Sequence, residues 1–179
     1  MDLTETRSIA ARDGQTFTVR RLRPGDDQAV QTFNWFCCHG YDDATIRKAL
    51  ARSEAGDDLL LGVFDGPRMI GYFFLWYFRQ PVPLLGIVLQ PDWQGRGLGR
   101  AMMDLLVEEA RAAGRDGVEL TTALDNHRAF ALYEKVGFVY WANVDNVLGN
   151  GQVVVERAMY YAIKPGSQAP RGSRHAPPV

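Results

Sequence analysis

The amino-acid sequence predicts an α/β domain of the α+β type: a mixed, mostly antiparallel sheet with one central pair of parallel strands and helices on both faces. Three observations support this fold class. The chain has 179 residues, of which 46% are hydrophobic, enough to enclose one core. Three strand-like runs follow one another with short turns, as in an antiparallel meander. A strand, an amphipathic helix and a further strand come next, and this order makes its two strands parallel.

The first part of the chain predicts one strand and two helices. Residues 16–22 alternate polar and apolar side chains, as a half-buried strand does. A Pro-Gly turn then leads into a helix over 27–38, which has apolar residues at roughly helical spacing. A second helix is expected over 42–52, because Ile46 and Leu50 lie four residues apart on one face.

Three apolar runs in the middle of the chain predict the meander. Residues 59–64 and 69–78 are joined by an Asp-Gly-Pro turn, which is typical of a hairpin. The second run has apolar residues at both parities, as a strand buried on both faces does. A third strand is expected over 84–89, after two prolines.

The second half of the chain predicts alternating helices and strands. Between residues 96 and 113, apolar side chains recur every three or four positions, and Gly114 follows as a stop signal. Residues 118–124 then predict the strand that completes the parallel pair. The remaining predicted elements are a helix over 127–136, capped by Asp125-Asn126, and strands over 138–143 and 152–163.

These elements predict one domain with two extensions. Residues 1–15 are polar and form an N-terminal extension, and the domain covers residues 16–163. The last stretch, 164–179, has four of the nine prolines and no apolar periodicity, so we expect a disordered tail.

The charge balance and the cysteines exclude several classes of function. A net charge of −1 provides no global basic field for nucleic acid, although 17 of the 20 basic residues are arginine. No apolar run is long enough to cross a bilayer as a helix, and the N-terminus lacks the apolar core of a signal peptide. Cys37 and Cys38 are adjacent and supply neither a disulfide framework nor a metal site, so we expect them in a helix core. These features favour a cytoplasmic protein without nucleic-acid, membrane or metal partners.

One segment has the pattern of a phosphate-binding loop. The run Gln94-Gly95-Arg96-Gly97-Leu98-Gly99-Arg100 lies at the expected junction of a strand and a helix. Glycines let backbone N–H groups approach a ligand, and the helix N-terminus, Arg96 and Arg100 add positive charge. The spacing fits neither the dinucleotide fingerprint nor a Walker loop, whose lysine is absent here. A glycine-rich turn without a ligand is the alternative interpretation.

This loop is part of the first of two longer motifs. The first is Leu89-Gln90-Pro91-Asp92-Trp93-Gln94-Gly95-Arg96-Gly97-Leu98-Gly99, and the second is Asn126-His127-Arg128-Ala129-Phe130-Ala131-Leu132-Tyr133-Glu134-Lys135-Val136-Gly137-Phe138. They resemble motif A, [Arg/Gln]-x-x-Gly-x-[Gly/Ala], and the block Asn-x-x-Ala-x-x-x-Tyr-x-x-x-Gly-Phe of the GNAT superfamily of N-acetyltransferases, in the same order. The resemblance extends over about residues 16–163 and implies the acyl-CoA N-acyltransferase fold.

The resemblance also implies roles for individual residues. The loop 94–100 would hold the pyrophosphate of coenzyme A through its backbone amides, and Val88 and Leu89 would pair with the pantetheine arm as a neighbouring strand does. Asn126 would contact the cofactor, and the Tyr133 hydroxyl would face its sulfur. Acyl transfer itself requires a donor for the developing oxyanion, which a backbone N–H near Leu89 can supply, and a proton for the thiolate, which Tyr133 can supply. The alternative for Tyr133 is an aromatic residue that only packs.

The general base is not identified by the resemblance. Many members have a glutamate on or just before the strand that precedes the loop, but residues 78–89 contain no Asp or Glu. Glu119 is one candidate, on the more polar face of its strand, and a solvated strand carboxylate is the alternative. His39 is a second candidate, since its pKa suits base catalysis and its position suits an acceptor site. Asp92 and Asp125 are better explained as turn and cap residues, and an amine that arrives neutral needs no base.

The aromatic run that precedes the loop is a candidate acceptor pocket. Trp76 or Tyr77, together with Arg79, would line this pocket, and burial of the strand on both faces is the alternative explanation.

The sequence therefore predicts an N-acetyltransferase that transfers an acetyl group from acetyl-CoA to a primary amine of a small molecule or peptide by direct attack. Two alternatives belong to other classes: a CoA-binding sensor without catalysis, favoured by the missing acid, and a nucleic-acid-binding domain, which the balanced charge opposes. Such folds often form homodimers, and no interface is marked in the sequence.

Overall fold

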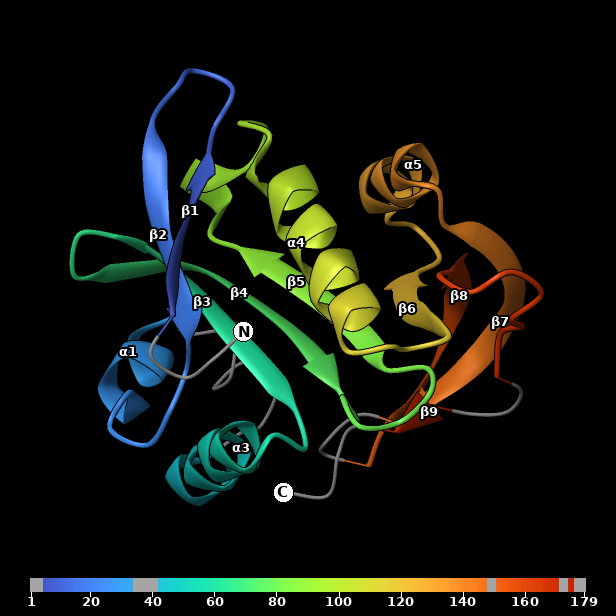
Figure 1. Ribbon diagram of the computed structural model, residues 1–179, viewed down its shortest axis with the longest axis horizontal. Coiled ribbons are helices and arrows are strands. Elements are labelled where there is room, and N and C mark those ends of the chain that lie inside the picture. The colour runs from blue at the N-terminus through green and yellow to red at the C-terminus, as the bar shows by residue number, and fades with distance from the viewer. Residues whose placement is uncertain (1–4, 34–41, 148–150, 171–173, 176–179) are drawn as a thin grey trace.

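The computed structural model describes residues 5–33, 42–147, 151–170 and 174–175, and it has the predicted mixed sheet (Figure 1). The strand order is β1-β2-β3-β4-β5-β6-β8-β7-β9, and the central β5–β6 pair is parallel. The strands are β1 (Thr6–Ala10), β2 (Thr16–Arg21), β3 (Leu59–Asp65), β4 (Arg68–Trp76), β5 (Leu84–Leu89), β6 (Gly117–Ala123), β7 (Val139–Val147), β8 (Val153–Ala162) and β9 (Arg174–His175). The helices are α1 (Asp27–Thr32), α3 (Asp43–Ala55), α4 (Leu98–Ala112) and α5 (His127–Val136), with a 3₁₀ turn, η1, at Pro91–Trp93.

The helices cover both faces of the sheet. α4 and α5 pack on one face over a core that includes Phe73, Leu106 and Met159, and α1 and α3 pack on the other (Figure 1). β4 contributes to both cores, because Phe73 faces α4 and Phe74 faces α3. The expectation that this strand is buried on both faces is confirmed.

The first strand was not predicted. Residues 6–10 lie in the expected extension, but they pair antiparallel with β2 from Thr6↔Arg20 to Ala10↔Thr16. An edge strand needs few apolar side chains, and here only Ile9 is buried, so no alternating pattern marks it. An ion pair of Arg7 with the buried Glu109 of α4, at 3.1 Å, also fastens it.

Two further predictions, the helix over 27–38 and the tail over 164–179, fall only in part within the described residues. The helix predicted over 27–38 is described only to Thr32, and the residues from 34 to 41, with Cys37, Cys38 and His39, lie outside the described ranges. In the expected tail, Lys164 Nζ pairs with Asp116 at 2.6 Å and the Ser167 hydroxyl donates to the Asp116 carbonyl. Residues 174–175 pair with β7. These contacts are long-range, so no local pattern predicts them.

The central parallel pair separates soon after it forms. Leu84↔Glu119 is the one Cα pair recorded between β5 and β6 in the described chain, and the Glu119 N–H donates to the Pro83 carbonyl beside it. β5 continues for five more residues, to Leu89, on a course that β6 does not follow. The strands therefore open toward their carboxyl ends, where the glycine loop begins.

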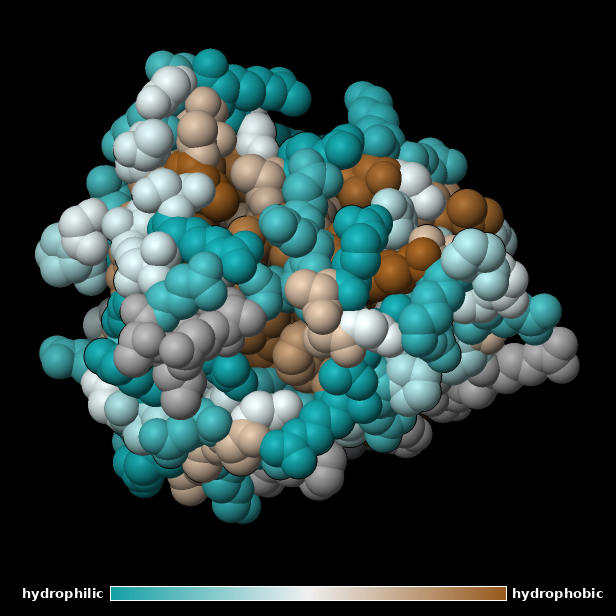
Figure 2. Space-filling view, in the orientation of Figure 1, coloured by the Kyte–Doolittle hydropathy of each residue, from teal (hydrophilic) through white to brown (hydrophobic). Residues whose placement is uncertain are grey.

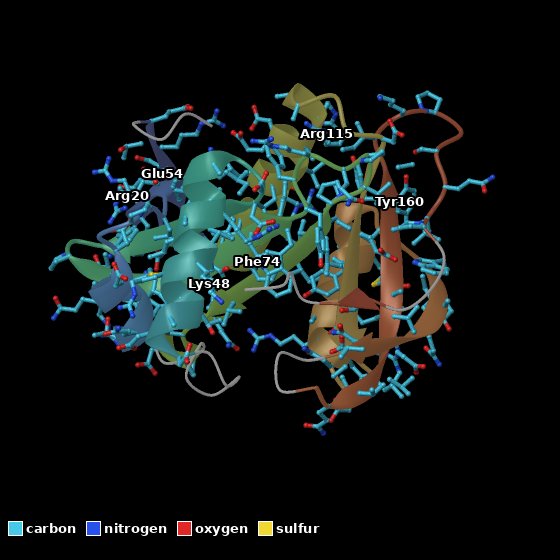
Figure 3. All side chains as sticks on the ribbon, turned by 90° about the horizontal axis from the view of Figure 1, so that it is seen from below. Arg20, Lys48, Glu54, Phe74, Arg115 and Tyr160 are labelled. Carbon is cyan, nitrogen blue, oxygen red and sulfur yellow. The ribbon has the colours of Figure 1, made fainter. Side chains whose placement is uncertain are left out.

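On the face of the sheet opposite α4 and α5, side chains from four strands form a row at the level where β5 and β6 are still paired. The register aligns Trp76, Leu84, Glu119 and Tyr160 across four neighbouring strands. Figure 3 shows α3, on which Lys48 is labelled, next to the part of this face where Phe74 lies, and Tyr160 farther to the right on the orange strands. Among the helices that the structure describes, none is long and apolar enough to span a membrane.

Candidate active site

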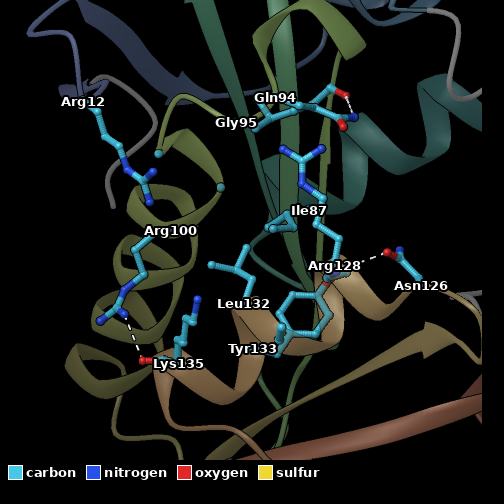
Figure 4. A pocket seen from close by; sticks show the side chains of 15 residues that line it. Arg12, Ile87, Gln94, Gly95, Arg100, Asn126, Arg128, Leu132, Tyr133 and Lys135 are labelled. Carbon is cyan, nitrogen blue, oxygen red and sulfur yellow. Dashed lines mark hydrogen bonds between the residues drawn. The ribbon is translucent and has the colours of Figure 1, made fainter.

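A pocket of about 550 Å³ lies where β5 and β6 part, between α4 and α5 (Figure 4). Figure 2 shows hydrophobic side chains in the hollow between these helices and hydrophilic ones around it. Eight of the residues proposed from the sequence line the pocket: Leu89, Gln94, Gly95, Gly97, Gly99, Arg100, Asn126 and Tyr133.

The glycine loop turns sharply into α4. Gly95 and Gly97 have φ values of 80° and 90°, which favour glycine, and Gly97 is the N-cap of the helix. The Gly97 carbonyl accepts from the N–H groups of Arg100 and Ala101, so the N–H groups of the first two helical residues have no acceptor within the helix. The Gln94 side chain donates to the Leu89 carbonyl and ties the loop to β5. This end of α4 is a site for an anion.

Three proposed cofactor residues are not in the pocket lining. The Arg96 guanidinium donates to Asp13 at 2.5 Å and to Gln15 at 2.7 Å, and it lies over the Trp93 ring. Leu98 is fully buried in the core under α4, and Val88 packs on the opposite face of the sheet. For Val88 and Leu98, only the backbone is available for the predicted roles.

The positive charge of the pocket differs from the prediction. Arg100 is paired with Asp104 at 2.8 Å, as Arg96 is with Asp13, so neither charge is free. Instead Arg12, Arg128 and Lys135 line the pocket, and none of them forms an ion pair with a described residue. No carboxylate is among the described lining residues.

The sequence could have indicated only some of these positively charged residues. Arg128 and Lys135 lie seven residues apart on α5, that is, two turns apart on one helix face. Arg12 belongs to the turn between β1 and β2, and nothing near it in the sequence marks a ligand site.

Tyr133 lies at the inner part of the pocket with its phenol ring largely buried, 8% exposed. Burial raises the pKa of Tyr133 to about 12, and the negative charge of Glu156 adds to the shift. Glu156, on β8, is a carboxylate that the sequence did not single out, and it accepts a hydrogen bond from Asn146 at 2.7 Å. Because its pKa is raised, Tyr133 keeps its proton at neutral pH.

Asn126 lines the pocket and also caps α5, because its Oδ1 accepts from the Ala129 N–H.

Glu119 is buried rather than solvated. It is 2% exposed, and Trp141 Nε1 donates to its Oε1 at 3.1 Å. The alternative of a solvated strand carboxylate is wrong, because β7 brings Trp141 across from a distant part of the chain. Glu119 is not in the pocket lining. Asp92 lies in the middle of η1, and Asp125 precedes Asn126, the N-cap of α5, as expected of turn and cap residues.

The three proposed acceptor residues have separate environments outside the pocket. Trp76 stacks on Phe74 with ring centroids 4.2 Å apart. Tyr77 has a φ of 56° and its N–H donates to Asp58. Arg79 donates to the Ala55 and Gly56 carbonyls at the end of α3, so it serves as a helix cap.

The sequence is similar to known acetyltransferases. The sequence profile of the acetyltransferase (GNAT) family matches residues 27–138. The mycothiol acetyltransferase of Paenarthrobacter aurescens is 33% identical over 138 residues, which are 69% of this chain and 43% of that protein. The [ribosomal protein bS18]-alanine N-acetyltransferase of Escherichia coli is 40% identical over 91 residues, 51% of this chain and 62% of that protein. The chain thus spans less than half the length of its mycothiol acetyltransferase relative.

Solved structures share the fold. The structure of yncA from Salmonella typhimurium with its cofactor acetyl-CoA has a TM-score of 0.69 at 18% identity, covering 85% of this chain and 96% of that one. Spermidine N-acetyltransferase from Vibrio cholerae with CoA and spermine has a TM-score of 0.67 at 19% identity, covering 82% and 95%. The chain therefore has the acyl-CoA N-acyltransferase fold. Because the family profile matches well over half of its length, the chain belongs to the acetyltransferase (GNAT) family.

Proposed function

We propose that this chain is an N-acetyltransferase that uses acetyl-CoA as co-substrate and a primary amine as acceptor. The observation that carries the proposal is one pocket that joins an anion site at the start of α4 to a buried, protonated tyrosine across the opening between β5 and β6. A glycine-rich turn without a ligand does not account for three unpaired cations around the same pocket.

The pocket suits each part of the cofactor. The free N–H groups at the start of α4 bind the pyrophosphate. Ile87, Leu89 and Leu132 provide apolar walls for the pantetheine arm. The backbone of β5 beyond Leu84 has no β6 partner, so it is available to the pantetheine amides, as proposed for Val88 and Leu89.

Tyr133 supplies the proton that the reaction needs. As the amine nitrogen forms its bond to the acetyl carbonyl carbon, negative charge develops on the oxygen, and a backbone N–H near Leu89 stabilises it. The carbon–sulfur bond then breaks, and the Tyr133 hydroxyl donates its proton to the leaving thiolate. The proton lost by the amine restores the tyrosine through solvent or a base.

Glu119 is the proposed base. Its side chain belongs to the face opposite the cofactor pocket, next to Tyr160 in the β6–β8 register. The Tyr160 hydroxyl is buried and has no hydrogen-bond partner among the described atoms, so a polar group is available there to an incoming amine. Glu156 is the second candidate, because its charge acts on Tyr133.

Matched glutamine variants distinguish the two carboxylates. Glu119→Gln keeps the acceptor for Trp141 but removes the ionisable group, and we expect kcat/KM at pH 7 to fall about 100-fold, with the acidic limb of its pH profile lost. Glu156→Gln is expected to keep that limb. If Glu156→Gln alone removes the acidic limb, Glu156 is the base, and if both variants keep it, the amine arrives neutral.

The names of the relatives mention different compounds: mycothiol, the alanine of ribosomal protein bS18, and spermidine. For this chain we propose a small-molecule or peptide amine. A panel with an amino sugar, a peptide with N-terminal alanine, and spermidine, assayed by thiol release, identifies the class. A homodimer and a cytoplasmic location remain predictions.

Acetyl-CoA is expected to stabilise the protein. A ligand present at about 100 times its Kd that binds only the folded state adds about 2.7 kcal/mol, which raises the midpoint of a chain this long by about 5–10 °C. Thermal unfolding with and without millimolar acetyl-CoA measures the shift. No shift would contradict the proposal, and a shift without thiol release from any amine would favour the non-catalytic sensor.

A further inference from the structure

The turn between β1 and β2 is fastened to the glycine loop, although it lies outside the part of the chain that the family profile matches. The Arg12 N–H donates to the Arg96 carbonyl at 2.8 Å. The Arg96 guanidinium in turn donates to Asp13 and Gln15, and it lies over the Phe17 and Trp93 rings. The turn and the loop therefore form one structural unit.

This unit directs Arg12 into the cofactor pocket. A Cβ added to Gly97 would lie 2.9 Å from Arg12 Cγ, so the aliphatic part of Arg12 packs against the glycine that begins α4. Figure 4 shows the Arg12 side chain extending toward the first turn of α4, on a different side of the pocket from Tyr133. No described carboxylate pairs with its guanidinium, in contrast to Arg96 and Arg100.

We propose that Arg12 binds the 3′-phosphate of coenzyme A, and that the Asp13–Arg96 ion pair positions it. This inference rests on the proposed function, which sets the direction of the cofactor. Tyr133 marks the thioester end and the N–H groups of α4 take the pyrophosphate, so the third phosphate lies beyond the loop, where Arg12 enters. A phosphomonoester has a charge of about −1.5 to −2 and three acceptor oxygens, which suit a guanidinium.

The ion pairs of the neighbouring arginines leave Arg12 as the residue that distinguishes the two ligands. Arg96 and Arg100 are already neutralised, while Arg128 and Lys135 approach from α5, on the other wall of the pocket. A side chain from the β1–β2 turn thus gives this chain a means to distinguish coenzyme A from the same molecule without its 3′-phosphate.

The test compares CoA with 3′-dephospho-CoA by calorimetry at 0.15 M ionic strength, roughly physiological. For Arg12→Ala we expect the Kd for CoA to rise about tenfold, equivalent to 1.4 kcal/mol, and the Kd for dephospho-CoA to change less than about twofold. Arg47→Ala is the control, because it removes the same charge from an exposed position on α3, which covers the opposite face. It should change neither Kd.

Other outcomes identify which part fails. An equal loss of affinity for both ligands would place Arg12 on the pyrophosphate, and no loss for either would remove it from the site; both overturn the inference. If the unchanged protein binds neither ligand, the proposed function fails instead.

Asp13→Ala keeps Arg12 but releases Arg96, and we expect the preference for CoA over dephospho-CoA to fall about threefold. An unchanged preference would contradict the positioning role of the ion pair.

Discussion

Replacing Tyr133 with phenylalanine is expected to slow acetyl transfer by about 100-fold and to leave the Kd for CoA unchanged. A positioned acid contributes about 10²- to 10⁴-fold, and the ring that packs in the pocket is retained. Steady-state thiol release gives kcat, and calorimetry gives the Kd. Tyr140→Phe is the matched control, because it removes the hydroxyl of an exposed tyrosine on β7 and should leave both values unchanged.

The pH dependence adds a second expectation for Tyr133. Burial raises its pKa to about 12, so the folded protein keeps the phenolic proton well above pH 10, where an ordinary tyrosine loses half of its protons. We therefore expect no loss of kcat with a midpoint near pH 10. A midpoint there that disappears in Tyr133→Phe would show that the hydroxyl is solvated, and a variant with full activity would end its role as the acid.

Replacing Asp58 with alanine is expected to destabilise the fold by about 3 kcal/mol. Asp58 is 2% exposed, and its carboxylate accepts from Arg52 at 2.7 and 3.1 Å and from the Tyr77 N–H at 2.8 Å. The last bond holds Tyr77 at a φ of 56°, which is unfavourable for a tyrosine. The lower end of the range for a broken buried pair applies, because Arg52 is 24% exposed and water solvates it in part.

Chemical denaturation measures this loss, and thermal unfolding should show a midpoint lower by about 6–12 °C. The neighbouring Asp57 is the control, since its ion pair with Arg79 is exposed, at 42% and 66%. Asp57→Ala should cost about 0.5 kcal/mol or less. Equal losses in the two variants would show that the Asp58 network contributes nothing beyond a surface ion pair.

The sequence predicts the elements whose patterns are local. The strand at 84–89 and the helix at 127–136 have the predicted bounds. The strand is an apolar run with prolines on both sides, and the helix has an Asn cap at its start and a glycine after its end, so each signal lies within a few residues of the element that it marks. The glycine loop was found for the same reason. Its turn into a helix requires positive φ at Gly95 and Gly97, and that requirement appears directly as glycines.

The distribution of charge in the site could not be predicted from local sequence patterns. Arg96 is neutralised by Asp13, 83 residues earlier in the chain, and that pairing depends on an edge strand with one buried side chain. The burial of Glu119 likewise depends on Trp141, 22 residues later. From the sequence, an arginine within the loop motif was expected to face the ligand. Whether its charge is available to the ligand depends on a carboxylate that is distant in the sequence.

Because β5 and β6 separate early, the rest of β5 is unpaired on one side, like an edge strand, although it lies in the middle of the sheet. Exposed edges of sheets recruit further strands and lead soluble proteins to aggregate, so most are shortened, charged or covered. Here α4 and α5 flank the unpaired part of β5, and its residues Ile87 and Leu89 line a pocket instead of an outer edge of the sheet. The protein thus retains the hydrogen-bonding capacity of an open edge without the risk of self-association that such an edge usually brings.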